Sequence, residues 1–250
     1  MVSRKPIAQE VESVETEDRL PEWKQQSIDR SLQAARSRAT ERSDRFVASA
    51  IAIMDQRGGL DFTVQDVVDH SRMSIRTFYK FFASKDDLLV AVHQTILASE
   101  LVPRLRKYCD AETDPVRRLK AYIQGMYDLT SRPGDSVQRA LTTFRNRLAE
   151  TRPEDLYRAY RPHFELVAEL VQDAAAAGEL KTNLPPDILA YLFYQAVLAV
   201  VHARILSPYD IDVTPDQLWL FCSEGIGAVP ASTKSTPKRS SPKRSTTRSR

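Results

Sequence analysis

Cysteine, glycine and long apolar runs are all scarce in this sequence. The two cysteines, Cys109 and Cys222, lie far apart and neither belongs to a CxxC pair, so we expect neither a disulfide framework nor a zinc site. No run of about 18 apolar residues occurs, so no membrane span is expected. Residues 1–20 are acidic and lack the apolar stretch of a secretory signal. Together these absences predict a cytoplasmic protein.

The common motifs of catalysis and nucleotide binding are also missing. The chain has no GxSxG, HExxH, GxGxxG or P-loop pattern. Its adjacent acids, Asp86-Asp87 and Glu154-Asp155, stand where helices are expected to begin, and there the helix dipole stabilises carboxylates in any case. We therefore expect no enzyme, no catalytic residues, no metal site and no cofactor.

The apolar pattern predicts an all-α fold. Glycine occurs only seven times, β-branched alternation is nearly absent, and apolar residues recur at spacings of three and four. Gly58-Gly59 should end the first helix, which the pattern leaves open as one helix or two. The expected helices span residues 23–57, 64–70, 75–81, 85–101, 115–131, 137–150, 154–177, 186–206 and 215–225.

Basic charge is concentrated at the C-terminal end. Residues 231–250 hold seven of the 36 basic residues and no acid, so the rest of the chain has more acidic than basic residues. The polar segments 1–22 and 230–250 are expected to be disordered. Two near-copies in the tail, Thr236-Pro-Lys-Arg239 and Ser241-Pro-Lys-Arg244, are suited to bind DNA by charge. A solvated tail without a partner is the equal alternative.

The most informative segment is residues 62–82. Thr63, with Asp66 three residues later, is typical of a helix N-terminus, and Ser74 is placed to cap a second helix after the turn Ser71-Arg-Met73. A short helix that is apolar on one side and carries donors near its N-terminus can enter a DNA major groove. The inward face is expected to hold Ile75, Phe78 and Phe82, and the outward face Arg76, Thr77, Tyr79 and Lys80.

This segment and its flanks resemble the DNA-binding domain of the TetR family of bacterial regulators. The resemblance covers about residues 42–92 and is carried by Gly58-Gly59, the run Ser74–Phe82 and the segment Ser84–Leu89. It implies an N-terminal helix-turn-helix domain over 23–92, including a helical extension, and a helical ligand-binding and dimerisation domain over 93–229. The family usually has a small residue in the turn where this chain has Arg72, and a left-handed non-glycine residue costs about 1 kcal/mol.

The resemblance also assigns the DNA contacts. Thr63, Tyr79 and Lys85 are expected at phosphates, while Arg76, Thr77 and Lys80 face bases or flanking phosphates. Arg72 and Ser74, in and after the turn, complete the predicted set. The structural alternative is that Thr63 and Ser74 only cap helices and that Tyr79 only packs.

A homodimer on a palindromic operator is the assembly that the resemblance implies. The pattern of residues 186–206 is apolar nearly all round, which favours burial on two sides, although these residues would also suit a single subunit's core. The predicted dimer residues are Leu189, Phe193, Val197, Val201 and Phe221.

The middle helices are expected to bind a small-molecule effector, with a hydrophobic compound weakly favoured. Gln195 and His202 share a face of one helix, and Arg145 and Arg147 would suit an anionic ligand or be merely solvated. The predicted ligand residues are Tyr122, Met126, Phe144, Phe164, Tyr194 and Gln195.

The function predicted from the sequence is a ligand-released homodimeric repressor of transcription in the cytoplasm, associated with the nucleoid. Its partners are then double-stranded DNA, a second copy of the chain and the effector, without a membrane. One alternative is a DNA-organising protein that depends on the basic tail and has no effector. An activator, or a regulator controlled by a protein partner, also stays open.

Overall fold

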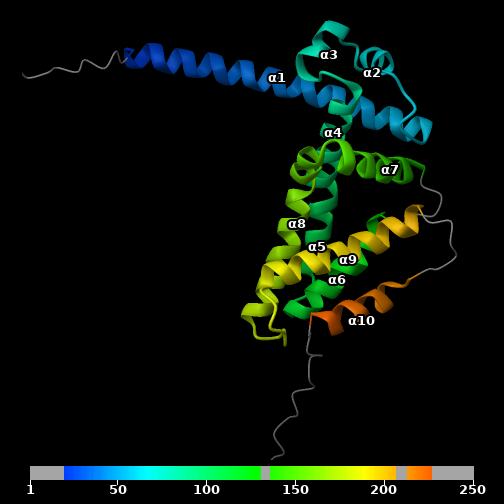
Figure 1. Ribbon diagram of the computed structural model, residues 1–250. Helices are drawn as coiled ribbons and strands as arrows, with labels where there is room; N and C mark the ends of the chain where they lie inside the picture. Colours follow the sequence, from blue (N-terminus) through cyan, green and yellow to red (C-terminus); the bar gives the residue numbers. More distant parts are fainter. Residues whose placement is uncertain (1–19, 131–135, 207–212, 227–250) are drawn as a thin grey trace, which may run out of the picture. The chain divides into compact units, whose positions relative to one another are not determined.

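In the computed structural model, residues 20–130, 136–206 and 213–226 are described, and every regular element among them is a helix (Figure 1). The predicted all-α class is therefore confirmed. The predicted disorder of the tail and of nearly all of the N-terminal segment lies outside the described residues. The helices are α1 (Glu22–Arg57), α2 (Val64–Ser71), α3 (Ile75–Phe81), α4 (Lys85–Thr95), the π-helix η1 (Ile96–Leu101), α5 (Val102–Asp110), α6 (Pro115–Thr130), α7 (Ser136–Thr151), α8 (Pro153–Ala176), α9 (Pro186–Leu206) and α10 (Pro215–Gly225).

The chain divides into two compact units, Met1–Arg45 and Phe46–Arg250. The described part of the first unit is helical and largely exposed, including the side chain of Trp23. The question of one N-terminal helix or two is answered, because α1 has no break. It ends at Arg57 and is followed by Gly58, whose φ of 68° is a left-handed conformation that glycine adopts without a side-chain clash. The domain boundary predicted at residue 92 stays a prediction.

Phenylalanine dominates the first of two hydrophobic cores in the second unit. The rings of Phe46 and Phe78 meet edge to face with centroids 5.4 Å apart, and Phe82 packs against both. Edge-to-face pairing adds to the stabilisation that burial alone provides. We call this the aromatic core; its other buried members are Val47, Ala50, Ile53, Met54, Phe62, Val67, Val68, Leu88, Leu89, Val90, Val92, Leu141, Phe144 and Leu148.

The second core, here called the bundle core, is made by the longer helices. Helix α5 packs against α6, α8 packs against α9, and α6 contacts α8, α9 and α10 (Figure 1). Each of these helices buries a stripe of aliphatic and aromatic side chains with helical spacing. Helix α7 contributes Leu141 and Phe144 to the aromatic core. The same helix also packs against α8 and α9. The two cores are thus joined through α7.

Four of the predicted dimer residues lie inside the chain's own core. Leu189, Phe193, Val197 and Val201 are all buried in the bundle core, so the single-subunit alternative holds for them. The reason is that α9 is apolar around most of its circumference, and such a pattern does not reveal which stripe faces inward. Phe221 on α10 is 70% exposed, as an interface residue of an isolated subunit should be. The exposed apolar residues of α9 are Ile188, Tyr191 and Leu192.

Two helical segments, Lys85–Asp110 and Pro186–Leu206, are long and apolar enough to cross a membrane by length and composition. Core helices of water-soluble proteins have the same property. In this structure Val92 of the first segment and Val197 of the second are fully buried in the two cores. Packing within the fold therefore accounts for the apolar character of their buried faces.

Candidate functional site

Helix α2 begins at a capping box. The backbone N–H of Thr63 donates to the Asp66 carboxylate at 2.6 Å, and the N–H of Asp66 donates to Thr63 Oγ1 at 3.1 Å. The Arg57 guanidinium donates two hydrogen bonds to the same carboxylate, the shorter at 2.8 Å. These bonds from Arg57, and those from Thr63, hold the pKa of Asp66 well below its usual range. The start of α2 is thereby fixed to the end of α1.

The turn between α2 and α3 contains the left-handed residue that the sequence predicted. Arg72 has φ 54° and ψ 37°, and its N–H donates to the Asp69 carbonyl at 3.2 Å. Met73 N–H donates to the Val68 carbonyl, also at 3.2 Å. These two bonds satisfy carbonyls at the end of α2, which offsets the strain at Arg72. The Arg72 side chain is exposed.

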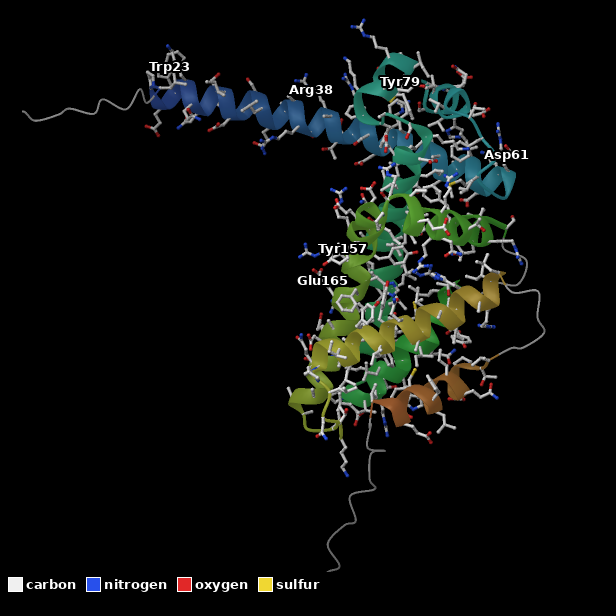
Figure 2. The ribbon with its side chains drawn as sticks, in the orientation of Figure 1. Trp23, Arg38, Asp61, Tyr79, Tyr157 and Glu165 are labelled. Atoms are coloured by element: carbon white, nitrogen blue, oxygen red, sulfur yellow. The ribbon has the colours of Figure 1, made fainter. Side chains whose placement is uncertain are left out.

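Helix α3 is apolar on its buried side and basic and aromatic on its exposed side. Ser74 Oγ accepts from the Thr77 N–H at 3.1 Å and caps the helix, while Phe78 is completely buried. Tyr79 is 57% exposed, and Figure 2 shows it on α3. Ile75, which the pattern placed inward, is 41% exposed because the helix starts there and Phe78 and Phe82 already fill the core. The other exposed residues of α3 are Arg76 and Lys80.

Lys85, which stays a predicted phosphate contact, has its ammonium group engaged within the protein. Its Nζ donates to the Leu60 carbonyl at 2.7 Å and to the Phe62 carbonyl, and it lies 4.4 Å from the centroid of the Phe62 ring. Desolvation by this burial lowers the pKa of the Lys85 ammonium. The loop between α1 and α2 leaves these carbonyls without helix partners, and Lys85 satisfies them. The side chain therefore ties α4 to that loop.

The N-terminal turn of α4 is linked to the larger helices by two ion pairs. Asp86 pairs with Arg147 of α7 at 2.7 Å, and Asp87 pairs with Arg152, just before α8, at 2.6 Å. Both pairs are partly exposed, so each contributes no more than about 1 kcal/mol. Their main effect is on position, because they hold the start of α4 against α7 and the start of α8.

A cavity opens among α4, η1, α5, α6, α7, α8 and α9. Its volume is about 160 Å³, below the roughly 300–1,000 Å³ of sites for drug-sized ligands, so it suits a small, compact molecule. Aliphatic residues form much of the wall, including Leu97, Leu198 and Ile205. Glu100 and Arg104, both exposed and one helical turn apart, stand among the lining residues. The cavity wall thus combines aliphatic residues with polar ones, and its two charged residues are exposed.

Of the six predicted ligand residues, Met126 lines this cavity and the other five lie elsewhere. Phe144 belongs to the aromatic core, and Phe164 packs edge to face on Tyr194 with centroids 5.6 Å apart. Tyr122 lies behind the wall, fully buried. Gln195 is exposed and donates to the Tyr191 hydroxyl at 3.2 Å, because it stands on the outward face of α9.

Three histidines line the cavity. His93 Nε2 is 2.8 Å from the Tyr160 hydroxyl, and His163 Nε2 is 2.8 Å from the Tyr122 hydroxyl. Desolvation lowers the pKa of His93 and His163 to about 4 and that of His202 to about 3. All three imidazoles are therefore neutral at pH 7.

Sequence reasoning did not select His93 or Tyr160. A signal existed for His93, which interrupts the apolar pattern of residues 85–101. Tyr160 carries no comparable signal, since an aromatic residue at a half-buried helix position is ordinary. The three histidines come from α4, α8 and α9, so only the fold brings them to one cavity.

Comparison with known proteins identifies the N-terminal region. Residues 46–92 match the family described as bacterial regulatory proteins, tetR family. Among solved structures, RolR in complex with resorcinol has a TM-score of 0.60 at 14% identity, covering 77% of this chain and 90% of RolR. Thermus thermophilus FadR with lauroyl-CoA has a TM-score of 0.59 at 18% identity, covering 76% and 97%.

E. coli NemR in its reduced form has a TM-score of 0.53 at 20% identity, covering 76% of this chain and 99% of NemR. At these identities the three structures establish a common fold. No curated protein sequence matches the chain.

Proposed function

We propose, from the premise that this chain belongs to the TetR family through its residues 46–92, that it is a homodimeric transcriptional repressor. It would bind a palindromic operator in the cytoplasm and leave it when a small molecule enters the cavity. The observation that carries the proposal is the exposed face of α3, where Arg76, Tyr79 and Lys80 stand on the outside of a helix-turn-helix whose inner side is fully packed.

The exposed α3 residues have the chemistry that DNA requires. Arg76 can donate two hydrogen bonds to a guanine edge, worth about 1–3 kcal/mol of discrimination. Tyr79 and Lys80 can donate to phosphates, which fix the register of the helix on the duplex. The capping hydroxyls of Thr63 and Ser74 are engaged with their own helices, so we assign them to positioning first.

Exposed apolar residues on α9 and α10 support a dimer. Tyr191, Leu192 and Phe221 are each at least half exposed, although large apolar side chains are normally buried. A two-fold axis beside these helices would bury them against a second copy and pair two α3 helices about 34 Å apart, one turn of DNA. The dimer residues in our proposal are accordingly Ile188, Tyr191, Leu192, Leu220 and Phe221 in place of the buried stripe of α9.

Helix α4 supports control by a ligand, because it contributes residues both to the aromatic core and to the cavity. Leu88 and Leu89 lie in the aromatic core beside α3, while His93, about one turn later, lines the cavity. A compound that favours one position of α4 would shift the population of DNA-binding conformations. RolR and FadR, which share the fold, were solved with resorcinol and lauroyl-CoA. These two complexes support the proposal that a small molecule binds this chain as an effector.

Two exposed tyrosines provide a matched test. Tyr79→Ala on α3 should weaken binding to a DNA site selected from random duplexes at about 150 mM salt, whereas Tyr157→Ala should not. Tyr157 is 68% exposed on α8 (Figure 2). Arg76→Ala should lower affinity by about 10- to 150-fold and relax base preference, with Arg117→Ala of α6 as its control. Circular dichroism and mass in solution should stay unchanged in all four variants.

Normal operator binding by both α3 variants would refute the assignment of α3 as the reading helix. The alternative of a DNA-organising protein is favoured by the basic residues of the C-terminal tail. It predicts that the full chain enriches no palindrome and that a chain ending at residue 229 loses all DNA binding. A palindrome enriched by both chains would support the repressor.

A further inference from the structure

Several buried polar groups near the cavity have no hydrogen-bond partner in the part of the chain that the structure describes. They are the Nδ1 atoms of His93 and His163, the hydroxyl of Tyr194 and Nε of Arg145. The His163 ring is 5.1 Å from the Tyr194 ring, and the Arg145 guanidinium is 5.4 Å from the ring of Tyr160. Unsatisfied buried polar groups are rare in native proteins, so such a group of neighbours indicates that something else satisfies them.

The hydrogen bonds already present identify what these groups offer. The Tyr122 hydroxyl lies 2.8 Å from His163 Nε2, and the arrangement in which Tyr122 donates and His163 accepts is the one that leaves no buried phenol proton unpaired. A neutral imidazole that accepts at Nε2 carries its proton on Nδ1. The same reasoning applies to Tyr160 and His93. Both free Nδ1 atoms are therefore N–H donors, and so is Nε of Arg145.

The charge around these donors is positive. Arg145 forms no ion pair with a described residue, and its Nη1 donates to the side-chain oxygen of Asn146 at 3.2 Å. The cavity histidines are neutral, and Arg145 contributes to keeping His93 and His202 so. The acid among the lining residues, Glu100, is exposed and lies one turn from Arg104. A half-buried arginine without a carboxylate partner favours an anion from outside.

We propose that the cavity binds a small organic carboxylate, with its carboxylate toward the histidine N–H groups of the wall, its charge balanced by Arg145 behind the wall residue Tyr160, and its apolar ring or short chain among the aliphatic wall residues. This inference rests on the proposed function, which assigns the effector to the same cavity. A carboxylate brings acceptors only, which matches an environment of donors. A cationic amine would meet the positive charge of Arg145, and a polyol would bring further donors to histidine and arginine atoms that themselves donate.

The histidine tautomers give a test that needs neither ligand nor DNA. In spectra of the full chain labelled with ¹⁵N-histidine at pH 7, His93 and His163 should both be the Nδ1–H tautomer. The single variants His93→Gln and His163→Gln assign the signals. Nε2–H tautomers at both residues would turn the free atoms into acceptors and would overturn the proposal.

A matched series of compounds tests the ligand directly by calorimetry and thermal unfolding. Benzoate and hexanoate at millimolar concentration should bind and raise the unfolding temperature, while benzyl alcohol and benzylamine should not. Arg145→Gln should weaken carboxylate binding at least about tenfold, and Arg139→Gln, an exposed arginine of the same helix, should not. Equal binding of the alcohol or the amine, no binding of either acid, or an unaffected Arg145→Gln variant would each overturn the proposal.

Measuring carboxylate binding and operator binding together distinguishes a failure of this inference from a failure of the proposed function. Carboxylate binding that depends on Arg145 but leaves operator affinity unchanged would keep the inference and remove the effector role. Release of the operator by a different compound, with no carboxylate bound, would do the reverse.

Discussion

The helix-turn-helix and the cavity wall solve the same problem, the placement of polar groups beside a hydrophobic core, in opposite ways. Around α2 and α3 the capping groups pair within three residues, as Thr63 does with Asp66 and Ser74 with Thr77. At the cavity the polar groups come from five helices, and several stay half paired. Hydrogen bonds between near neighbours in sequence hold the helix-turn-helix in one rigid conformation. Polar atoms without a hydrogen-bond partner at the cavity leave donors for a bound molecule.

The largest effect should come from the aromatic core. Phe78→Ala removes a ring that contacts Phe46, Tyr79 and Phe82, and it should lower the free energy of unfolding by about 3–5 kcal/mol. Urea unfolding followed by circular dichroism measures this loss. Phe193→Ala, an equally buried truncation in the bundle core, is the matched variant. A loss below about 1 kcal/mol for Phe78→Ala would mean that α3 is not held by its core.

The second effect is a loss of stability at acidic pH, which should begin at a higher pH for the cavity than for the helix-turn-helix. His163 is neutral when folded, with a pKa of about 4 against its ordinary 6.5, so between these values the unfolded chain binds the extra proton. Stability should therefore fall as the pH drops from 6.5 toward 4, by up to about 1.4 kcal/mol per pH unit for each such histidine. Asp66 in the capping box has a lowered pKa, and its contribution is lost only below its ordinary 3.8.

Urea unfolding at several pH values between 7 and 4 gives the profile. His163→Gln should flatten it, while His70→Gln, at an exposed histidine of α2, should leave it steep. An unchanged slope in His163→Gln would show that the acid sensitivity does not arise from His163.

The smallest effect should come from a cap. Thr63→Ala removes the hydroxyl that accepts from the Asp66 N–H, while the backbone N–H of residue 63 can still donate to the Asp66 carboxylate, and it should reduce stability by about 1 kcal/mol. Thr143→Ala, at an exposed position inside α7, removes a hydroxyl that bonds only its own helix and should be neutral or slightly stabilising. Equal losses in the two variants, measured by thermal unfolding, would contradict a special role for the cap.

The sequence predicted the helix-turn-helix well because its determinants are close together along the chain. The caps at Thr63 and Ser74 and the left-handed Arg72 depend on neighbours within four residues, and the four-residue spacing of Phe78 and Phe82 already marks the inward face of α3. Ile75 was the exception, since a first-turn residue has no preceding turn to fix its direction, and the sequence pattern alone did not show that the core was already full.

The cavity was poorly predicted because its determinants are distant along the chain. Phe144 and Tyr122 are apolar-pattern residues, and the pattern says that they are buried but not in which core. On α9 an apolar residue at nearly every position hid the inward stripe, so Gln195 and four dimer residues were placed on the wrong side. His93 and Tyr160 become partners only when α4 meets α8.

The π-helix η1 sets the angular register between the two regions. Buried or half-buried residues continue at four-residue spacing from His93 through Leu97, Leu101 and Leu105 to Cys109. In an ordinary α-helix that spacing drifts by about 40° each time and would carry the stripe away from the core. The wider turn, seen in the bond from Val102 N–H to the Leu97 carbonyl, takes up this drift. Deleting one residue at Ala98 would turn everything before it by about 100° relative to α5. The alignment of α4 with the bundle therefore depends on the number of residues in this turn as well as on their chemistry.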